Sequence, residues 1–209
     1  MLADFVMLHV PAALPGALLG GFHGLNPAMG WLFAVFLALQ RRSRQALLMA
    51  LLPIAAGHAA SVAAIALIIL AARSTLPVMP VRLSTALAVL LFGTYKLLTL
   101  PRHPRWVGLN VGYTDLAWWS FLMATAHGSG LMLAPLVLGV PGSGEAAWLL
   151  LVHNLAMLGV MAAMALLVYL KLGVMAVRRL WVNYDLLWAV CLLLAGAAAL
   201  TGLLIAPAH

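Results

Sequence analysis

Four histidines stand inside stretches that are otherwise apolar, and they are the residues of this chain best suited to chemistry. They are His23, His58, His127 and His153. A neutral imidazole is a ligand for transition metals, and the same ring exchanges a proton near neutral pH. Ionisable groups are costly at membrane depth and by default mark functional sites there. A structural role stays open, in which each histidine only links two helices by a hydrogen bond.

Small polar residues lie close to these histidines in the sequence and would complete a polar shell around a bound ion. The predicted ion- or substrate-binding residues are His23, Asn26, His58, Ser61, His127, Ser129, His153 and Asn154, with the four histidines as metal ligands. Methionines in the middle of the apolar stretches offer thioether ligands for Cu(I), although methionine at helical spacing more often only packs. A transition-metal ion, as substrate or as ligand, is the cofactor that this chemistry allows.

Two of the histidines stand within residues that weaken a helix. His23 lies in GGFHGLNPAMG, Gly20–Gly30, where four glycines and Pro27 interrupt a charge-free run. His127 lies in ATAHGSG, a second glycine-containing cluster. A broken membrane helix leaves backbone groups unpaired unless a neighbouring helix, a cavity or a ligand satisfies them. Both clusters therefore predict either a site or a tight helix contact.

The elements that position these residues are predicted to be membrane helices. The chain has 209 residues, of which 66% are hydrophobic and 7% charged, a composition that excludes a soluble globular domain. Six stretches approach the roughly 20 apolar residues that a span needs: about 12–39, 47–72, 83–100, 115–139, 146–170 and 184–206. We expect one all-α transmembrane domain over 1–209, with the first and fourth helices broken and residues 1–11 as an interfacial lead-in.

The histidines also indicate an internal repeat. His23-Gly24 and His127-Gly128 are offset by 104 residues, and His58 and His153 by 95. Two triplets of spans, about 12–100 and 115–206, would then repeat each other. Because three is odd, the second triplet enters the membrane from the opposite side, as in many secondary transporters.

Charged and aromatic residues set the expected orientation. Nine of the eleven Lys and Arg residues fall on one side of the predicted spans, which the positive-inside rule assigns to the cytoplasm. Both termini would lie outside, most simply in a bacterial inner membrane. Lys96 is expected to reach an interface, and Trp188 to join an aromatic belt. Asp115 and Asp185 begin the fourth and sixth spans, where a capping role is the simplest interpretation.

The six spans, the break in the first span, the RRSRQ hairpin after it and the GHAAS step in the second together resemble the LysE superfamily of membrane transporters. The chain is most similar to the nickel/cobalt (NicO-like) and urease-accessory-type branch, whose first span carries a His-x4-Asp-His metal motif. His23 and His58 match the histidines of the first and second spans. Ala28 and Met29 replace the Asp-His pair, and Asn26 stands where the family tends to have another Asp. The resemblance implies a six-helix transporter fold, with most of the acidic ligands missing.

The leading hypothesis is a secondary transporter, an exporter or exchanger, that moves a small cation or transition-metal ion by alternating access. One alternative is a membrane electron-transfer protein with heme b between His58 and His153, or between His23 and His127. Another is a non-transporting subunit of a membrane complex or homo-oligomer. We find no catalytic motif, so the chain is not predicted to be an enzyme. The expected partners are the lipid bilayer and a small ion or small molecule. Nucleic acid is not an expected partner, because in a membrane protein the net charge of +7 reflects contact with anionic lipid.

Overall fold

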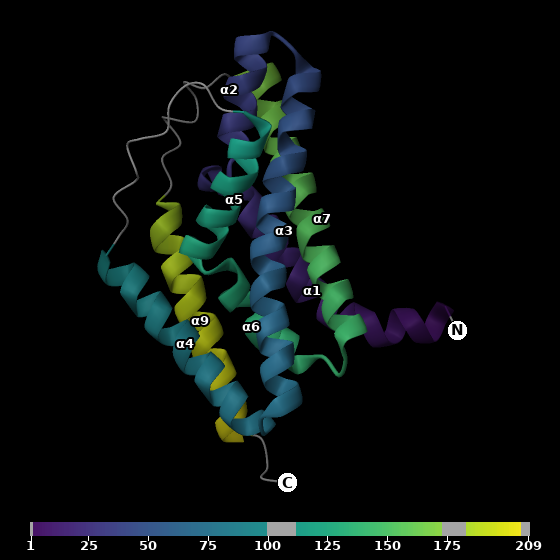
Figure 1. The fold of residues 1–209 in the computed structure, drawn as a ribbon, viewed down its shortest axis with the longest axis vertical. Helices are drawn as coiled ribbons and strands as arrows, with labels where there is room; N and C mark the ends of the chain where they lie inside the picture. Colours follow the sequence, from purple (N-terminus) through teal and green to yellow (C-terminus); the bar gives the residue numbers. More distant parts are fainter. Residues whose placement is uncertain (1, 100–111, 173–182, 206–209) are drawn as a thin grey trace.

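A computed structural model describes the chain over residues 2–99, 112–172 and 183–205, and this part is helical without strands. Four helices are long and apolar enough to cross a membrane, or five if one bent pair counts as a single span. The all-α prediction is confirmed over the described residues, and these four or five candidate spans are consistent with an integral membrane protein. Figure 1 shows the helices running roughly along one long axis, with the first turns of the chain extending to one side.

The helices follow the predicted stretches closely, although several are longer. The first stretch holds α1 (Leu2–Leu25), the short 3₁₀-helix η1 (Pro27–Met29) and α2 (Trp31–Arg41). They are followed by α3 (Arg44–Thr75) and α4 (Val78–Thr99), then by α5 (Tyr113–His127) and α6 (Ser129–Gly139). The last elements are α7 (Ser143–Leu167), which continues into the π-helix η2 (Val168–Leu172), and α9 (Tyr184–Ile205). Residues 2–11 of the predicted interfacial lead-in form the first turns of α1.

Both predicted breaks are present, and each has a local cause. In the first, the Asn26 side chain accepts a hydrogen bond from the backbone N–H of Ala28 at 3.0 Å, and Pro27 begins η1. Gly30 then takes the left-handed conformation, with φ of +114°, before α2 starts. In the second, Gly128 has φ of +72° and the axes of α5 and α6 meet at 68°. Only glycine adopts this conformation freely, so glycine fixes both breaks.

The helices pack in pairs that are distant in sequence. α1 packs against α7, α3 against α5, and α4 against α9 (Figure 1). Glycines permit the closest of these approaches. A Cβ atom on Gly20 of α1 would overlap the backbone carbonyl of His153 on α7, and one on Gly57 of α3 would overlap that of Ala117 on α5. Small residues of this kind let membrane helices meet backbone to backbone.

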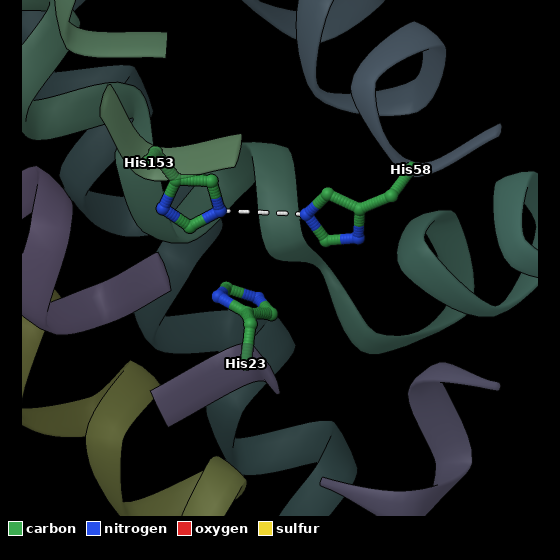
Figure 2. A group of neighbouring side chains, drawn as sticks. All are labelled: His23, His58 and His153. Atoms are coloured by element: carbon green, nitrogen blue, oxygen red, sulfur yellow. Dashed lines mark hydrogen bonds between the residues drawn. The ribbon is translucent and has the colours of Figure 1, made fainter. Parts of the chain in front are cut away.

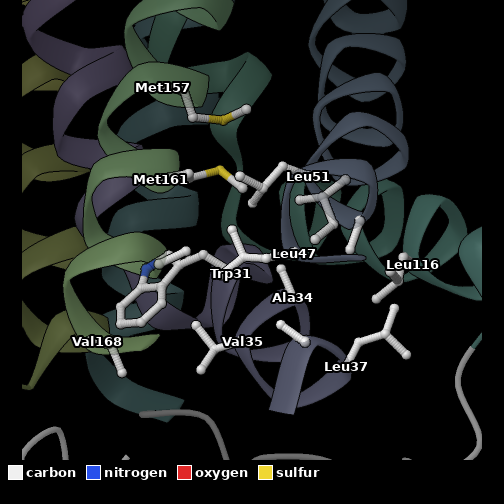
Figure 3. Packing of buried hydrophobic residues seen from close by; sticks show 14 residues of the cluster. Trp31, Ala34, Val35, Leu37, Leu47, Leu51, Leu116, Met157, Met161 and Val168 are labelled. Carbon is white, nitrogen blue, oxygen red and sulfur yellow. The ribbon is translucent and has the colours of Figure 1, made fainter. Parts of the chain in front are cut away.

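The largest apolar cluster lies between α2, α3 and α7. Trp31, Leu47, Leu51, Met157 and Met161 are all buried within it (Figure 3). The two methionines are thus surrounded by aliphatic and aromatic side chains, which favours packing as their role. The cluster secures the second half of the broken first segment against α3 and α7.

Candidate intramembrane metal site

Three of the four predicted histidine ligands meet inside the helix bundle. His23 comes from α1, His58 from α3 and His153 from α7, and all three have no exposed surface. A ring nitrogen from each lies within 4.8 Å of one from each of the others. Figure 2 shows the ring of His23 facing the space between the other two rings. We call these three residues the histidine triad.

Hydrogen bonds to backbone carbonyls fix the protons on two members of the triad. Nδ1 of His23 lies 2.9 Å from the carbonyl oxygen of Leu19, and Nδ1 of His153 lies 3.2 Å from that of Gly16. A carbonyl can only accept, so both Nδ1 atoms carry the proton. Each ring, when neutral, keeps a lone pair on Nε2. Metal-bound histidines typically donate their second ring N–H to a backbone carbonyl in this way.

The separations within the triad suit a shared ion. The Nε2 atoms of His58 and His153 lie 3.4 Å apart, which is long for a hydrogen bond. Two nitrogens bonded at about 2.0–2.1 Å to one tetrahedral ion are separated by about 3.4 Å. Nε2 of His23 and Nδ1 of His58 are buried and have no hydrogen-bond partner. An ion bound between the three rings would give Nε2 of His23 a partner, once the ring of His23 moved slightly toward the other two.

The donor set limits the ions that fit. Within the described residues, no carboxylate or thiolate joins the three imidazoles in this cluster. Imidazole suits zinc, copper, nickel and iron, whereas hard ions such as Mg²⁺ and Ca²⁺ require oxygen ligands. Three nitrogens also leave a tetrahedral ion one open position. The triad can therefore bind a borderline or soft transition-metal ion and leave it accessible to a further ligand.

No protein-family model, curated protein or solved structure matches this chain in our comparisons.

The fourth predicted ligand, His127, has a different neighbour. Its Nδ1 lies 2.8 Å from the carbonyl oxygen of Met123, and its Nε2 lies 3.3 Å from Oδ1 of Asp185 on α9. The structure thus separates the four predicted histidines into a triad of neutral donors and one histidine paired with a carboxylate.

The polar residues predicted beside the histidines make other contacts. Asn26 caps η1, and Asn154 donates to the carbonyl of Leu150 on its own helix at 2.7 Å. Ser61 and Thr125 join α3 to α5 through their hydroxyl groups, 2.9 Å apart. Ser129 is buried at the start of α6, and its hydroxyl has no partner. None of these hydrogen bonds reaches the triad, and the bond of Ser61 is the one that joins two helices.

Two residues around the His127–Asp185 contact, Lys96 and Trp188, differ from their predicted roles. Lys96 was expected to reach the interface, but it is 9% exposed and interacts electrostatically with Asp185. Trp188 was expected in an aromatic belt, yet it is 1% exposed, and its indole N–H donates to the carbonyl of His127. Asp185 lies in the first turn of α9, as predicted, and also contacts His127. Asp115 caps α5, accepting a hydrogen bond from Gly112 N–H at 2.8 Å.

A sequence signal for this second group existed in α9. Asp185 and Trp188 are three residues apart, so they share one face of the helix. A carboxylate and an indole on one face indicate a surface that contacts another helix rather than lipid. This spacing could have pointed to α9 as a functional helix.

Proposed function

We propose that this protein is a membrane transporter, an exporter or exchanger, that binds a transition-metal ion at His23, His58 and His153. The observation that carries the proposal is the triad itself, in which three buried rings bring their nitrogens within 4.8 Å of one another, with Nε2 of His23 and of His153 unprotonated. Histidines that served only to link helices would have both ring nitrogens in hydrogen bonds, because an unsatisfied buried polar group is costly. Here two ring nitrogens have no partner.

Transport, rather than static metal storage, is supported by the two helix breaks. Each break leaves a helix end inside the bundle, and each turns on a glycine with positive φ. Paired broken helices at corresponding positions of two repeats are typical of secondary transporters. Rearrangement at the breaks would open the triad alternately to the two sides of the membrane.

The helix pairing supports an inverted repeat. If α1, α3 and α4 correspond to α5, α7 and α9, a two-fold axis exchanges the α1–α7 contact with the α5–α3 contact and maps the α4–α9 contact onto itself. All three of these contacts occur. The His58–His153 contact would then join two equivalent residues at the axis. The six-helix repeat, the LysE-like assignment and the placement of both termini outside a bacterial inner membrane belong to this proposal.

The geometry favours an ion over heme. A heme ligated by His58 and His153 would place a flat macrocycle between their Nε2 atoms. The ring of His23 faces that space, with its centroid 5.1 Å from the ring of His58 and 4.9 Å from that of His153. The second predicted heme pair, His23 with His127, is disfavoured for a different reason, because Nε2 of His127 already contacts Asp185.

Metal binding is tested with the detergent-purified full chain and Co²⁺, whose visible d–d absorption intensifies on tetrahedral coordination. We expect one Co²⁺ per chain, and His23→Ala, His58→Ala and His153→Ala should each abolish the absorption. Ser120→Ala is the matched control, because Ser120 is also buried but lies outside the triad. Equal Co²⁺ spectra for all four variants would refute the site, and a Soret band in the untreated protein would restore the heme hypothesis.

Transport is tested in proteoliposomes that enclose a fluorophore quenched by Co²⁺. Added Co²⁺ should quench the dye with the wild-type chain and with Ser120→Ala, and much more slowly with His58→Ala. Binding without any quenching above that of empty liposomes would leave a metal-binding membrane protein and exclude transport of this ion.

A further inference from the structure

A second polar group lies inside the bundle and is not used by the triad. His127 ends α5 and is 3% exposed, and Asp185 lies in the first turn of α9 with 17% of its side chain exposed. Their side chains approach to 3.3 Å. Lys96 of α4 interacts with Asp185, and the ammonium nitrogen lies 5.8 Å from the ring centroid of Phe92.

A neutral His127 imidazole and an ionised Asp185 carboxylate together carry one proton too few for the two contacts of the His127 ring. Nδ1 donates to a backbone carbonyl, so the neutral ring would present an unprotonated Nε2 to the carboxylate oxygen of Asp185. Two acceptors facing each other at 3.3 Å repel. A proton must therefore lie between them, on His127 as an imidazolium or on Asp185 as a carboxylic acid.

Both members of the pair lie at helix ends, where the helix dipole acts on charge. An imidazolium is stabilised in the last turn of a helix, and a carboxylate in the first turn, which are the positions of His127 and Asp185. Lys96 of α4 is the cation that interacts with Asp185. His23 of α1 is the ionisable neighbour of His127 on the side of the triad. α3 meets α5 here through the uncharged hydroxyl pair of Ser61 and Thr125.

One indole separates this pair from the triad. The ring of Trp188 lies 4.2 Å from that of His23, centroid to centroid, and its N–H donates to the carbonyl of His127. The indole also stacks on Phe22, at 5.5 Å and 7°. The triad and the pair are therefore neighbouring charge sites in a water-poor interior, where like charges repel strongly.

We infer that the His127–Asp185 pair binds one exchangeable proton and that this proton and a metal ion at the triad disfavour each other. The inference rests on the proposed function only for its second half. When the metal ion binds, the proton leaves His127 Nε2 for water, Asp185 being the member of the pair that reaches the surface. Because linkage is reciprocal, protonation of the pair weakens metal binding by the same factor. A transporter with this coupling exchanges metal for protons.

The proton of the pair is tested without metal. The protein is labelled with ¹⁵N-histidine, and its ring resonances are followed as pH is raised. His127 should lose one proton in a step that Asp185→Asn shifts or abolishes. Asp115→Asn is the matched control, because it removes the carboxylate that starts α5 and should leave the step unchanged. A His127 ring that stays neutral throughout, with Asp185 ionised, would overturn the inference whether or not metal binds.

The coupling is tested by the pH dependence of Co²⁺ affinity. In the pH range of this step the wild-type affinity should rise about tenfold per pH unit, since one proton is displaced per ion. His127→Gln and Asp185→Asn should still bind Co²⁺ with a flatter dependence, and Asp115→Asn should follow the wild type. The same slope in all four proteins would overturn the coupling. No Co²⁺ binding to the wild type would refute the proposed function and the coupling, but not the proton of the pair.

Discussion

A single methyl group on Gly20 should open the triad while all three of its histidine side chains are kept. A Cβ atom there would lie 2.9 Å from the carbonyl carbon of His153 and 3.1 Å from its Cα atom, closer still to the oxygen, whereas ordinary contact begins at about 3.4 Å. All of these are backbone atoms that cannot rotate away. Gly20→Ala therefore requires α1 to move from α7 by roughly 1 Å or more.

That displacement acts directly on the histidine triad, because His23 lies one turn after Gly20 on α1. The nitrogens of the triad already extend to 4.8 Å from one another, against the roughly 3.4 Å that a shared ion requires. A further separation of about 1 Å removes His23 from coordination. We expect Co²⁺ affinity to fall by about 10–100-fold, which is the loss typical when the residues that position a metal ligand are disturbed. This corresponds to about 1.4–2.7 kcal/mol of binding free energy.

The measurement is a Co²⁺ titration of purified protein, with far-UV circular dichroism to verify that the helices remain. Gly159→Ala is the control, since Gly159 lies on α7 in the same contact pair of helices, yet a Cβ atom there would meet nothing within 4 Å. It should bind as the wild type does. Unchanged affinity in Gly20→Ala, or an equal loss in Gly159→Ala, would refute the link between this helix contact and the triad.

Three further features of the bundle are tested by substitution and chemical unfolding in detergent. Arg73→Gln removes charge-assisted hydrogen bonds to two backbone carbonyls after α6 and should lower the free energy of unfolding by about 1 kcal/mol. Ser61→Ala should cost about 0.6 kcal/mol, and Thr125→Ser should cost less because it keeps the hydroxyl pair. Gly128→Ala should cost about 1 kcal/mol or more through its positive φ, whereas Gly144→Ala should be nearly neutral. Equal stabilities within any of these comparisons would contradict the corresponding contact.

The helices and their breaks could be predicted from the sequence because both depend on local chemistry. An apolar run long enough to span indicates a helix, and glycine with proline indicates where it breaks, as at Gly30 and Gly128. The helix ends were less predictable. α3 runs from Arg44 to Thr75 because backbone hydrogen bonds continue past the apolar run into polar residues.

The grouping of the histidines could not be predicted, because it depends on which helices touch. In the sequence His23 and His127 are equivalent, each followed by glycine at a helix break. In the fold, α1 brings His23 to His58 and His153, whereas α9 brings a carboxylate to His127. Trp188 illustrates the same limit, since a tryptophan near the start of a span suits both an interface and a buried helix contact.

This division of the histidines provides an electrostatic reason for exchange. A transition-metal ion bound by three neutral imidazoles in a membrane has no negatively charged ligand. Burying its uncompensated charge therefore costs free energy. Asp185 contacts His127 and interacts with Lys96, and Trp188 lies between His127 and the triad. Loss of the proton makes the net charge of the His127–Asp185 pair more negative by one unit, which offsets part of the charge of the arriving ion. Metal entry with proton departure therefore keeps the charge of the bundle interior more nearly constant than either event alone.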